Sequence, residues 1–197
     1  MDATKLLTDD ECFKMQSIKS YAEPKVKPAP LDARDWSIIT FILNTGVRVG
    51  EFVQIRTNWL YFARQIRPSM EIPKECAKYG SGRIIPLNDK CKEVVSYLIT
   101  SLWFGLWDEE NHYAWSGQPK TSPMTVRQVQ RIIHERSLYI IGRAITPHTL
   151  RHTFASRLLR VASIKVVQEL LGHASIQSTQ IYTHTNTQEL QDAVQKL

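Results

Sequence analysis

Apolar residues recur at helical spacing along most of this chain, and the pattern changes character once, between residues 59 and 87. That interval holds short apolar or alternating pieces separated by prolines and a Gly-Ser-Gly turn, as in short strands. A chain of 197 residues with 43% hydrophobic content is long enough to bury one sizeable core. The sequence therefore predicts a single domain of the α+β class, mainly α-helical, with one small antiparallel sheet.

Capping and helix-breaking residues delimit the helical stretches. Thr146 followed by Pro147 is typical of a helix start, and Gly172 is typical of a left-handed helix end. Near the C-terminus, three apolar residues share one helical stripe. We therefore expect a short helix capped by Ser175, and helices over residues 33–43, 49–55, 89–106, 125–139, 147–160, 163–171 and 188–197.

The interval between residues 59 and 87 predicts one three-stranded antiparallel sheet. Pro68 has no N–H to donate, so it would have to lie at an edge or a bulge. Residues 1–31 end in a segment with three prolines and no hydrophobic period, which predicts an extended lead-in. The strands are expected at Trp59–Phe62, Gln65–Ile72 and Arg83–Leu87.

Basic residues are unevenly distributed along the chain. The net charge is +6, and between Lys120 and Lys165 there are nine lysines and arginines but one acid, Glu135. Such a field suits a polyanionic partner, although a solvated helical surface would explain the charges equally well.

The compartment is predicted from absences. No run of about 18 apolar residues occurs, and the N-terminus lacks the apolar core of a secretory signal, so we expect a cytoplasmic protein. The three cysteines are scattered and form no CxxC pair, which argues against disulfides and a thiolate metal site.

A protein hydroxyl that attacks a phosphodiester needs a proton acceptor, fixed positive charge on the phosphate and an acid for the leaving oxygen. The chain offers a candidate for each role. Arg48 follows a glycine-containing break, His148 and Arg151 lie three apart on one helical face, and Tyr182 lies in the last segments.

Three segments carry a more specific pattern, LNTGVRVGE, HTLRHTFASRLL and LGHASIQSTQIYTH. They resemble the conserved boxes of the tyrosine recombinase, or phage integrase, family. The resemblance covers nearly the whole chain and keeps the family's order: an early Arg, a hairpin Lys, His-x-x-Arg, then a His followed nine residues later by Tyr. It implies the catalytic-domain fold of that family, and a site-specific recombinase or integrase that acts on double-stranded DNA.

The resemblance implies that Arg48 and Arg151 bind the scissile phosphate. Guanidinium groups suit this role because they bind phosphate bidentately and stay charged. Either arginine alone would be interpreted as a surface salt bridge. Glu51, three residues after Arg48, matches the family's usual acid and would orient Arg48, although a plain solvated helix charge is the alternative.

Lys78 resembles the family's hairpin lysine and would protonate the departing 5′ oxygen, with Lys74 as the rival candidate. His148 would accept the tyrosine proton or hold the phosphate, because an imidazole exchanges protons near neutral pH. His173 would donate a hydrogen bond to a phosphate oxygen. Taken alone, either histidine would be assigned a capping or core role.

Tyr182 matches the family's nucleophile, whereas most tyrosines are packing residues. A phenol has a reference pKa of about 10, so nearby arginines and a base would be needed to make it reactive. The expected intermediate is a 3′-phosphotyrosyl ester with a free 5′ hydroxyl. Rejoining then needs no ATP, and no cofactor is expected.

His148 and His152 have the spacing of a zinc pair on one helical face. The intervening residues lack the glutamate of the HExxH motif, so we expect no metal site. His152 and His184 are expected to support the site or the fold, since family motifs often read RHTFA and YTH.

Most members of the family carry an N-terminal domain that clamps the far side of the DNA, and we expect this sequence to be without it, either as a fragment or as a naturally minimal protein. Residues 1–197 are therefore expected to form one catalytic domain with weak, salt-dependent affinity for DNA. The tail helix, residues 187–197, is too short to be stable alone, and it is expected to dock on a neighbouring protomer in a dimer and then a tetramer. The alternatives are a non-catalytic DNA-binding accessory module and a type IB topoisomerase-like enzyme.

Overall fold

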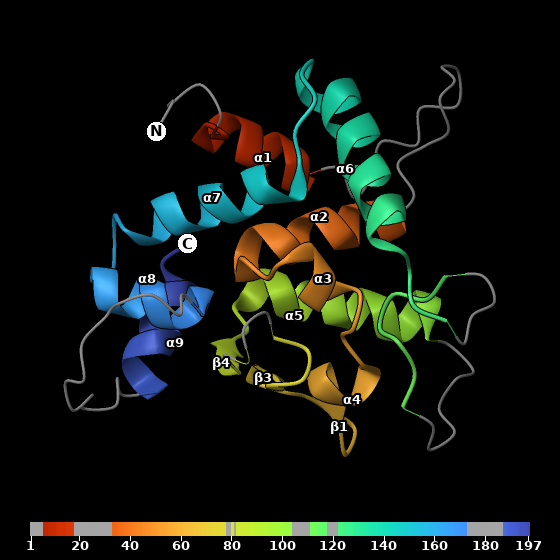
Figure 1. Ribbon diagram of the computed structural model, residues 1–197, viewed down its shortest axis with the longest axis vertical. Coiled ribbons are helices and arrows are strands. Elements are labelled where there is room, and N and C mark those ends of the chain that lie inside the picture. The colour runs from red at the N-terminus through yellow and green to blue at the C-terminus, as the bar shows by residue number, and fades with distance from the viewer. Residues whose placement is uncertain are drawn as a thin grey trace.

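The computed structural model describes residues 6–17, 33–77, 80, 82–103, 111–117, 122–172 and 187–197. The described residues are mainly helical, with small antiparallel sheets, as predicted (Figure 1). A π-helical turn, Leu98–Leu102, follows α5. The helices are α1 Asp9–Ser17, α2 Ala33–Thr45, α3 Val49–Phe52, α4 Thr57–Leu60, α5 Asp89–Tyr97, α6 Val126–Ile141, α7 Pro147–Leu158, α8 Ile164–Leu171 and α9 Thr187–Gln195.

Helix α2 runs through the centre of the molecule, between α7 and α5 (Figure 1). The predicted inward residues Trp36, Ile39 and Leu43 are buried, and so are polar residues on its other sides. A surrounded helix must satisfy its polar side chains internally. The Thr45 hydroxyl accordingly donates to the Phe41 carbonyl at 2.6 Å, and the helix continues two residues past its predicted end.

The single three-stranded sheet that we predicted is corrected to two separate antiparallel pairs within the described residues. The first strand pairs with the second, and the third with the fourth, in a register that sets Ser69 opposite Pro86. The strands are β1 Tyr61–Phe62, β2 Gln65–Ile66, β3 Ser69–Ile72 and β4 Arg83–Pro86.

Pro68 explains the division of the sheet. It lies between β2 and β3, where a residue without an N–H cannot continue the ladder of hydrogen bonds. Its carbonyl accepts a hydrogen bond from the Leu87 N–H at 2.9 Å, so Pro68 closes the end of the β3–β4 pair. Trp59, predicted as strand, lies in α4 instead.

We predicted an extended lead-in over residues 1–31, but the described residues include helix α1; residues 1–5 and 18–31 of the lead-in lie outside the described part. Thr8 and Glu11 form a reciprocal capping box: Glu11 accepts from the Thr8 N–H at 2.8 Å, and Thr8 accepts from the Glu11 N–H at 3.1 Å. Cys12 and Met15, three residues apart, are buried. The sequence contains this helix-start signal, but the three prolines in residues 21–31 led to the prediction of an extended segment instead.

Three consecutive helices begin with a side-chain cap, and the sequence predicted the one at Thr146. The side chains of Thr125, Thr146 and Ser163 each accept a backbone N–H at the start of α6, α7 and α8. Gly172 ends α8 with a φ of +59°. Helix α3 is shorter than predicted, because it ends at Phe52 rather than Ile55.

Helix α9 packs on α8 and on β4 of its own chain. Its apolar stripe is buried there, with Leu190 at 5% and Val194 at 0% exposure. These residues join Phe154, Leu158 and the apolar side of α8 in a cluster separate from the main core. The apolar stripe that we predicted in the tail is therefore covered by α8 and β4 of the same chain.

The cysteines are free thiols, and burial raises the pKa of Cys12 to about 11. None of the helices in the described ranges is both long enough and apolar enough to cross a membrane.

Candidate active site

Arg48 lies at the N-terminal end of α3, directly after the turn that leaves α2. Gly46 makes that turn with a φ of +61°. The Arg48 guanidinium reaches the C-terminus of α8, where its Nη2 donates to the Gly172 carbonyl at 3.1 Å. Segments far apart in sequence therefore meet at this side chain.

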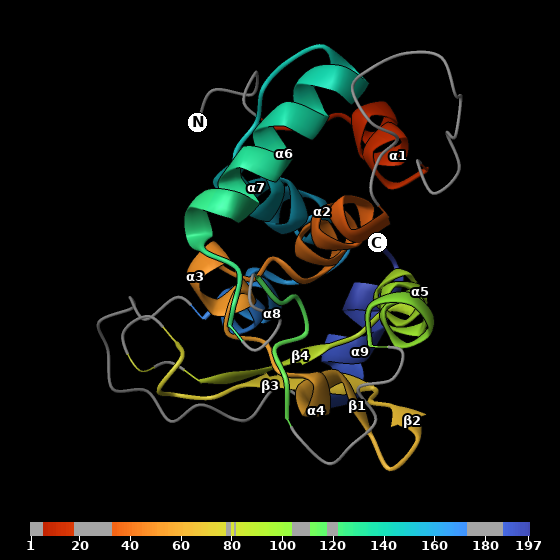
Figure 2. The same cartoon turned by 90° about the vertical axis from the view of Figure 1, so that its right-hand side faces the viewer.

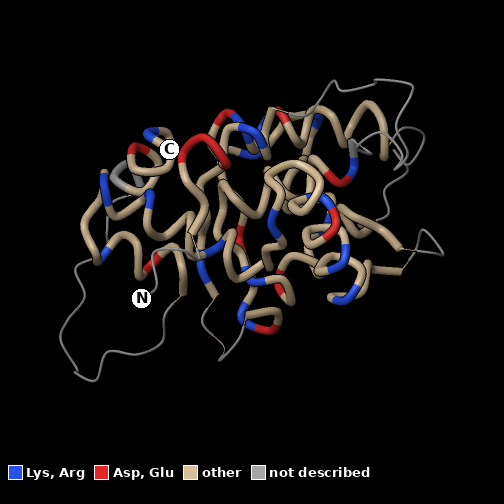
Figure 3. Tube along the Cα trace, turned by 90° about the horizontal axis from the view of Figure 1, so that it is seen from above, with Lys and Arg blue, Asp and Glu red and all other residues tan. Residues whose placement is uncertain are grey.

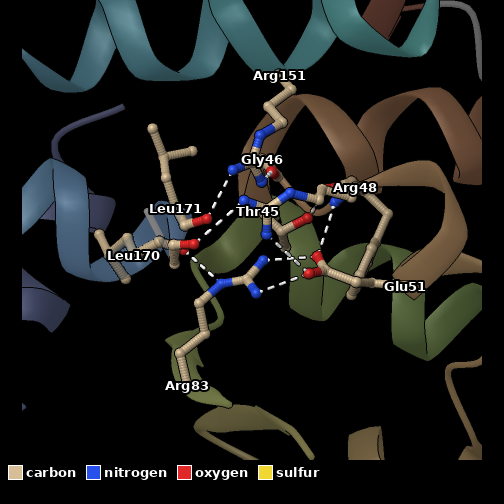
Figure 4. A network of polar contacts seen from close by, with 10 residues as sticks. Thr45, Gly46, Arg48, Glu51, Arg83, Arg151, Leu170 and Leu171 are labelled. Atoms are coloured by element: carbon tan, nitrogen blue, oxygen red, sulfur yellow. Dashed lines mark hydrogen bonds and ion pairs between the residues drawn. The ribbon is translucent and has the colours of Figure 1, made fainter. Parts of the chain in front are cut away.

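Glu51 holds Arg48 in two ways, as Figure 4 shows. Its Oε2 accepts the Arg48 backbone N–H at 2.9 Å, and its Oε1 pairs with the Arg48 Nη1 at 3.0 Å. Glu51 is only 2% exposed, so it is not the solvated helix charge that was the alternative. The contact agrees with the orienting role inferred from the sequence.

Arg151 projects from α7 and is buried beside Arg48. Its Nη1 donates to the Gly46 carbonyl at 2.5 Å and its Nη2 to the Leu171 carbonyl at 2.6 Å. Burial, and then the positive charges of Arg48 and Arg83, lower the pKa of Arg151 to about 10. It still carries its positive charge at neutral pH.

Arg83 is a third arginine at the site, and the sequence analysis did not identify it. Its Nη1 and Nη2 bind the two oxygens of Glu51 at 3.0 and 2.7 Å, and its Nε donates to the Leu170 carbonyl at 2.7 Å. The sequence does contain a signal that Arg83 is buried and paired. Arg83 lies two residues before Ile85 in one strand, so period-two alternation places it on the inward side, where a charged group needs a partner.

The three arginines converge on the C-terminus of α8 (Figure 4). Arg83, Arg151 and Arg48 donate to the successive carbonyls of Leu170, Leu171 and Gly172. The last carbonyls of a helix have no partner within it and form the negative end of its dipole, so cations are favoured there. The helix end thus gathers guanidinium groups from α3, β4 and α7 in one place.

His148 lies in the first turn of α7 and is exposed. It lines a groove of about 690 Å³ together with Val49, the residue that follows Arg48. His152 is also exposed, and the centroids of the two imidazole rings are 6.5 Å apart. Exposed residues of α6 line the same groove, including Arg127, Arg131 and His134.

Three of the six predicted catalytic residues are therefore placed, Arg48, His148 and Arg151. Lys78, His173 and Tyr182 lie outside the described residues, as do Ser175 and His184. Lys74, the rival to Lys78, is exposed in the turn after β3. Among the residues that are described, no group of three or more His, Cys, Asp or Glu side chains could hold a metal ion.

The fold is mainly helical, and it brings three arginines together near an exposed histidine and a groove. These features define a class of protein that is suited to binding an anionic group. The sequence profile of the phage integrase family matches residues 7–189. The chain belongs to the phage integrase family.

Similar proteins agree with this assignment. A tyrosine recombinase of Pseudothermotoga lettingae is 36% identical over 166 residues, covering 83% of this chain and 54% of that protein. The tyrosine recombinase XerC of Thermodesulfovibrio yellowstonii is 33% identical over 200 residues, covering 98% of this chain and 62% of that one. The chain thus spans less than two thirds of the length of these relatives.

Solved structures show the same fold. The XerA recombinase matches with a TM-score of 0.65 and 28% identity, over 95% of this chain and 63% of that one. The XerH recombinase, in a post-cleavage complex with palindromic difH substrate, matches with a TM-score of 0.64 and 27% identity, over 96% and 51%. The predicted tyrosine recombinase catalytic-domain fold is confirmed.

Proposed function

We propose that this chain breaks and rejoins DNA strands at specific sites through a 3′-phosphotyrosyl intermediate. One observation carries the proposal: Arg48 and Arg151, from α3 and α7, donate to adjacent carbonyls at one helix end, so their guanidinium groups lie side by side. Such a pair is opposite in charge to a phosphodiester, can bind its oxygens with several hydrogen bonds, and can stabilise the extra negative charge that develops during attack. The two relatives and the two solved neighbours described above are all named recombinases.

In the proposed reaction, the Tyr182 hydroxyl attacks the phosphorus and its proton passes to His148. The bond from phosphorus to the 5′ oxygen breaks, and that oxygen takes a proton from Lys78 or from its rival Lys74. Arg48, Arg151 and His173 hold the non-bridging oxygens while charge develops on them. The ester preserves the bond energy, so attack by a 5′ hydroxyl reverses the step without ATP. No metal or other cofactor takes part in this scheme.

Double-stranded DNA is the proposed partner, and the groove beside His148 is its proposed contact surface. Arg127 and Arg131 of α6 are exposed along that groove. Basic and acidic residues are interspersed over the rest of the trace (Figure 3). We propose that Arg127 and Arg131 attract the phosphates to this groove. For the chain by itself we propose weak affinity that falls steeply with salt.

Assembly on DNA is also proposed, as a dimer and then a tetramer joined through the C-terminal helix. Because α9 covers α8 and β4 of its own chain, exchange requires that the helix leave this surface and occupy the same surface on a neighbour. Deletion of residues 187–197 should then abolish synapsis while single-site binding persists. Unchanged synapsis would contradict the exchange.

We also propose that the protein lies in the cytoplasm and is associated with the nucleoid when it is bound to DNA.

Trapping on a nicked half-site tests the proposed chemistry. We expect the chain to form a covalent adduct with DNA, peptide mapping to place the attachment at Tyr182, and Tyr182→Phe to abolish it. Tyr139→Phe is a matched control, because Tyr139 is exposed on α6 and should not affect the adduct. Salt-sensitive binding without any adduct would instead support a DNA-binding accessory module, and relaxation of plasmids at no specific site would support a topoisomerase-like activity.

A further inference from the structure

Arg83 binds the Glu51 carboxylate, and this carboxylate in turn binds Arg48. Both oxygens of Glu51 are shared: Oε1 accepts from Nη1 of Arg48 and Nη1 of Arg83, each at 3.0 Å. Oε2 accepts from the Arg48 backbone N–H at 2.9 Å and from Nη2 of Arg83 at 2.7 Å. A bidentate guanidinium lies in the plane of the carboxylate and fixes its rotation. Arg83 therefore determines where Glu51 presents its oxygens to Arg48.

Arg83 also fixes the end of α8. Its Nε binds the Leu170 carbonyl, and a Cβ added to Gly172 would lie 3.1 Å from both Cδ and Nη1 of Arg83. The side chain thus packs directly against the residue whose carbonyl receives Arg48. Two of the partners of Arg48, Glu51 and Gly172, are both in contact with Arg83.

The pairing keeps Glu51 charged in a buried place. Burial raises the pKa of Glu51, but the hydrogen bonds and charge of Arg83, followed by the hydrogen bonds from Arg48, more than offset this and hold the pKa below its usual value. Removal of Arg83 would leave a buried carboxylate with Arg48 as its remaining direct partner. That carboxylate would then be free to rotate toward Arg48 and to draw its guanidinium out of place.

We propose that Arg83 is a positioning residue for the phosphate-binding arginines. It holds the Glu51 carboxylate and the last turn of α8 in one arrangement, and it thereby sets where Arg48 lies relative to Arg151. The inference rests on the proposed function, because it concerns the geometry in which a phosphate would be held. Arg83 itself points at protein groups, so it acts through Arg48 and not on the phosphate.

Arg83→Lys tests this, because lysine keeps the charge but loses the fork that binds both oxygens. Adduct formation on a nicked half-site is followed in a single turnover at increasing DNA concentration. We expect the rate at saturating DNA to fall roughly 10- to 100-fold, the effect of displacing a reacting group by about 1 Å. The half-saturating DNA concentration should change by less than about threefold, since contacts outside the site dominate affinity. An unchanged saturating rate would overturn the proposal.

Arg143→Lys is the matched control. Arg143 binds both oxygens of Glu11 at 2.7 and 2.8 Å and donates to the Leu6 carbonyl at 2.7 Å, which repeats the bonding pattern of Arg83 away from the site. We expect Arg143→Lys to lower the melting temperature while the adduct rate, measured below that temperature, stays at the wild-type value. If both variants lower the rate equally, Arg83 has a structural role only.

Combining Arg83→Lys with Glu51→Gln distinguishes a positioning role of Arg83 from a role in folding. If Arg83 acts through Glu51, the effects of Arg83→Lys and Glu51→Gln on the rate should be strongly non-additive. Should Arg83→Lys not fold, the double variant Arg83→Met with Glu51→Gln removes the buried Arg83–Glu51 ion pair as a unit, so neither of these two positions is left charged without the other, and it should fold. Its rate should remain low, and recovery to the wild-type rate would overturn the proposal. A wild-type chain that forms no adduct at all would defeat the proposed function instead.

Discussion

At Gly46 the backbone turns sharply between α2 and α3, and the residue is confined from two sides. Its φ of +61° is a conformation that L side chains rarely adopt, and a Cβ there would lie 2.3 Å from Cδ1 of Phe154. Its carbonyl receives the Arg151 guanidinium. One glycine thus permits both the turn that presents Arg48 and the close approach of α7.

Gly46→Ala should therefore be strongly destabilising. The left-handed backbone and the overlap with the Phe154 ring together should cost roughly 3 kcal/mol of unfolding free energy, or about 10 °C in melting temperature. Thermal and urea unfolding measure the change. Gly50→Ala is the control: Gly50 lies in α3, and a Cβ added there would have nothing within 4 Å, so stability should hold or rise slightly. Equal melting temperatures for Gly46→Ala and Gly50→Ala would contradict this account.

At the scale of elements, α6 and α7 form the walls of the groove beside His148. The apolar side of α6 packs inward through Val129, Ile132 and Ile133, which leaves Arg127 and Arg131 facing out. Amphipathic patterning thus places charge along the groove without any direct contact to the arginine site.

Replacing Arg127 and Arg131 together by glutamine should weaken DNA binding. Each phosphate contact releases counterions, so the slope of log affinity against log salt should become shallower by about 2 when two contacts are lost. Fluorescence anisotropy over a salt series measures it. As a control, Lys90 and Lys92 belong to α5, which does not line the groove and lies across the molecule from α3 (Figure 2), so their replacement should leave the slope unchanged. Identical slopes for the wild type and the α6 variant would rule out this contact surface.

Helix α9 depends on its apolar face for its place in the fold. Val194 is fully buried against α8 and β4, so Val194→Ala should reduce the unfolding free energy by about 2 kcal/mol. Gln195, the next residue, is exposed, and Gln195→Ala should change stability by less than about 0.5 kcal/mol. Chemical denaturation of both variants compares them. Equal stabilities would mean that α9 contributes little in cis.

Across the whole molecule, ion pairs tie α1 to segments from the other end of the chain. Glu11 binds Arg143 after α6, and Asp9 pairs with Arg157 and Arg160. The Leu7 N–H donates to the Thr153 hydroxyl at 3.0 Å. These contacts bring the first described residues into the helical layer that carries Arg151.

The Glu11 pair should make stability fall in acid. The hydrogen bond from Arg143 lowers the pKa of Glu11 from 4.5 to about 2, despite partial burial. A lowered carboxyl pKa contributes stability that is fully present above about pH 4.5 and is lost as the pH falls toward 2. Since Arg143 is about one third exposed, solvent screening keeps the contribution to roughly 1 kcal/mol.

Urea unfolding of wild type and Glu11→Gln at several pH values measures this. The variant should be less stable at pH 7, and the difference should shrink below pH 4.5 as the wild-type carboxyl becomes protonated. A difference that stays constant down to pH 2 would show that the ion pair is not its source.

The sequence alone determined the mainly helical class, the Thr146 cap of α7 and the end of α8 at Gly172. The assignment of Arg48, Glu51, His148 and Arg151 to one site came from the family resemblance and stays a prediction. The helical class, the cap and the helix end could be predicted because they depend on residues within a few positions of each other. The capping box of α1 belongs to the same class of signal.

The tertiary structure alone decided which distant groups meet. The sequence places Arg83 in a strand, but its contact with Glu51 and with the last turn of α8 depends on how β4 packs against α3 and α8. The split of the sheet at Pro68 and the burial of α9 against its own chain likewise depend on packing. A buried charge or carbonyl without a partner costs free energy, so each one needs a hydrogen-bond partner. Which distant residue supplies that partner depends on how the helices and strands pack in the folded chain.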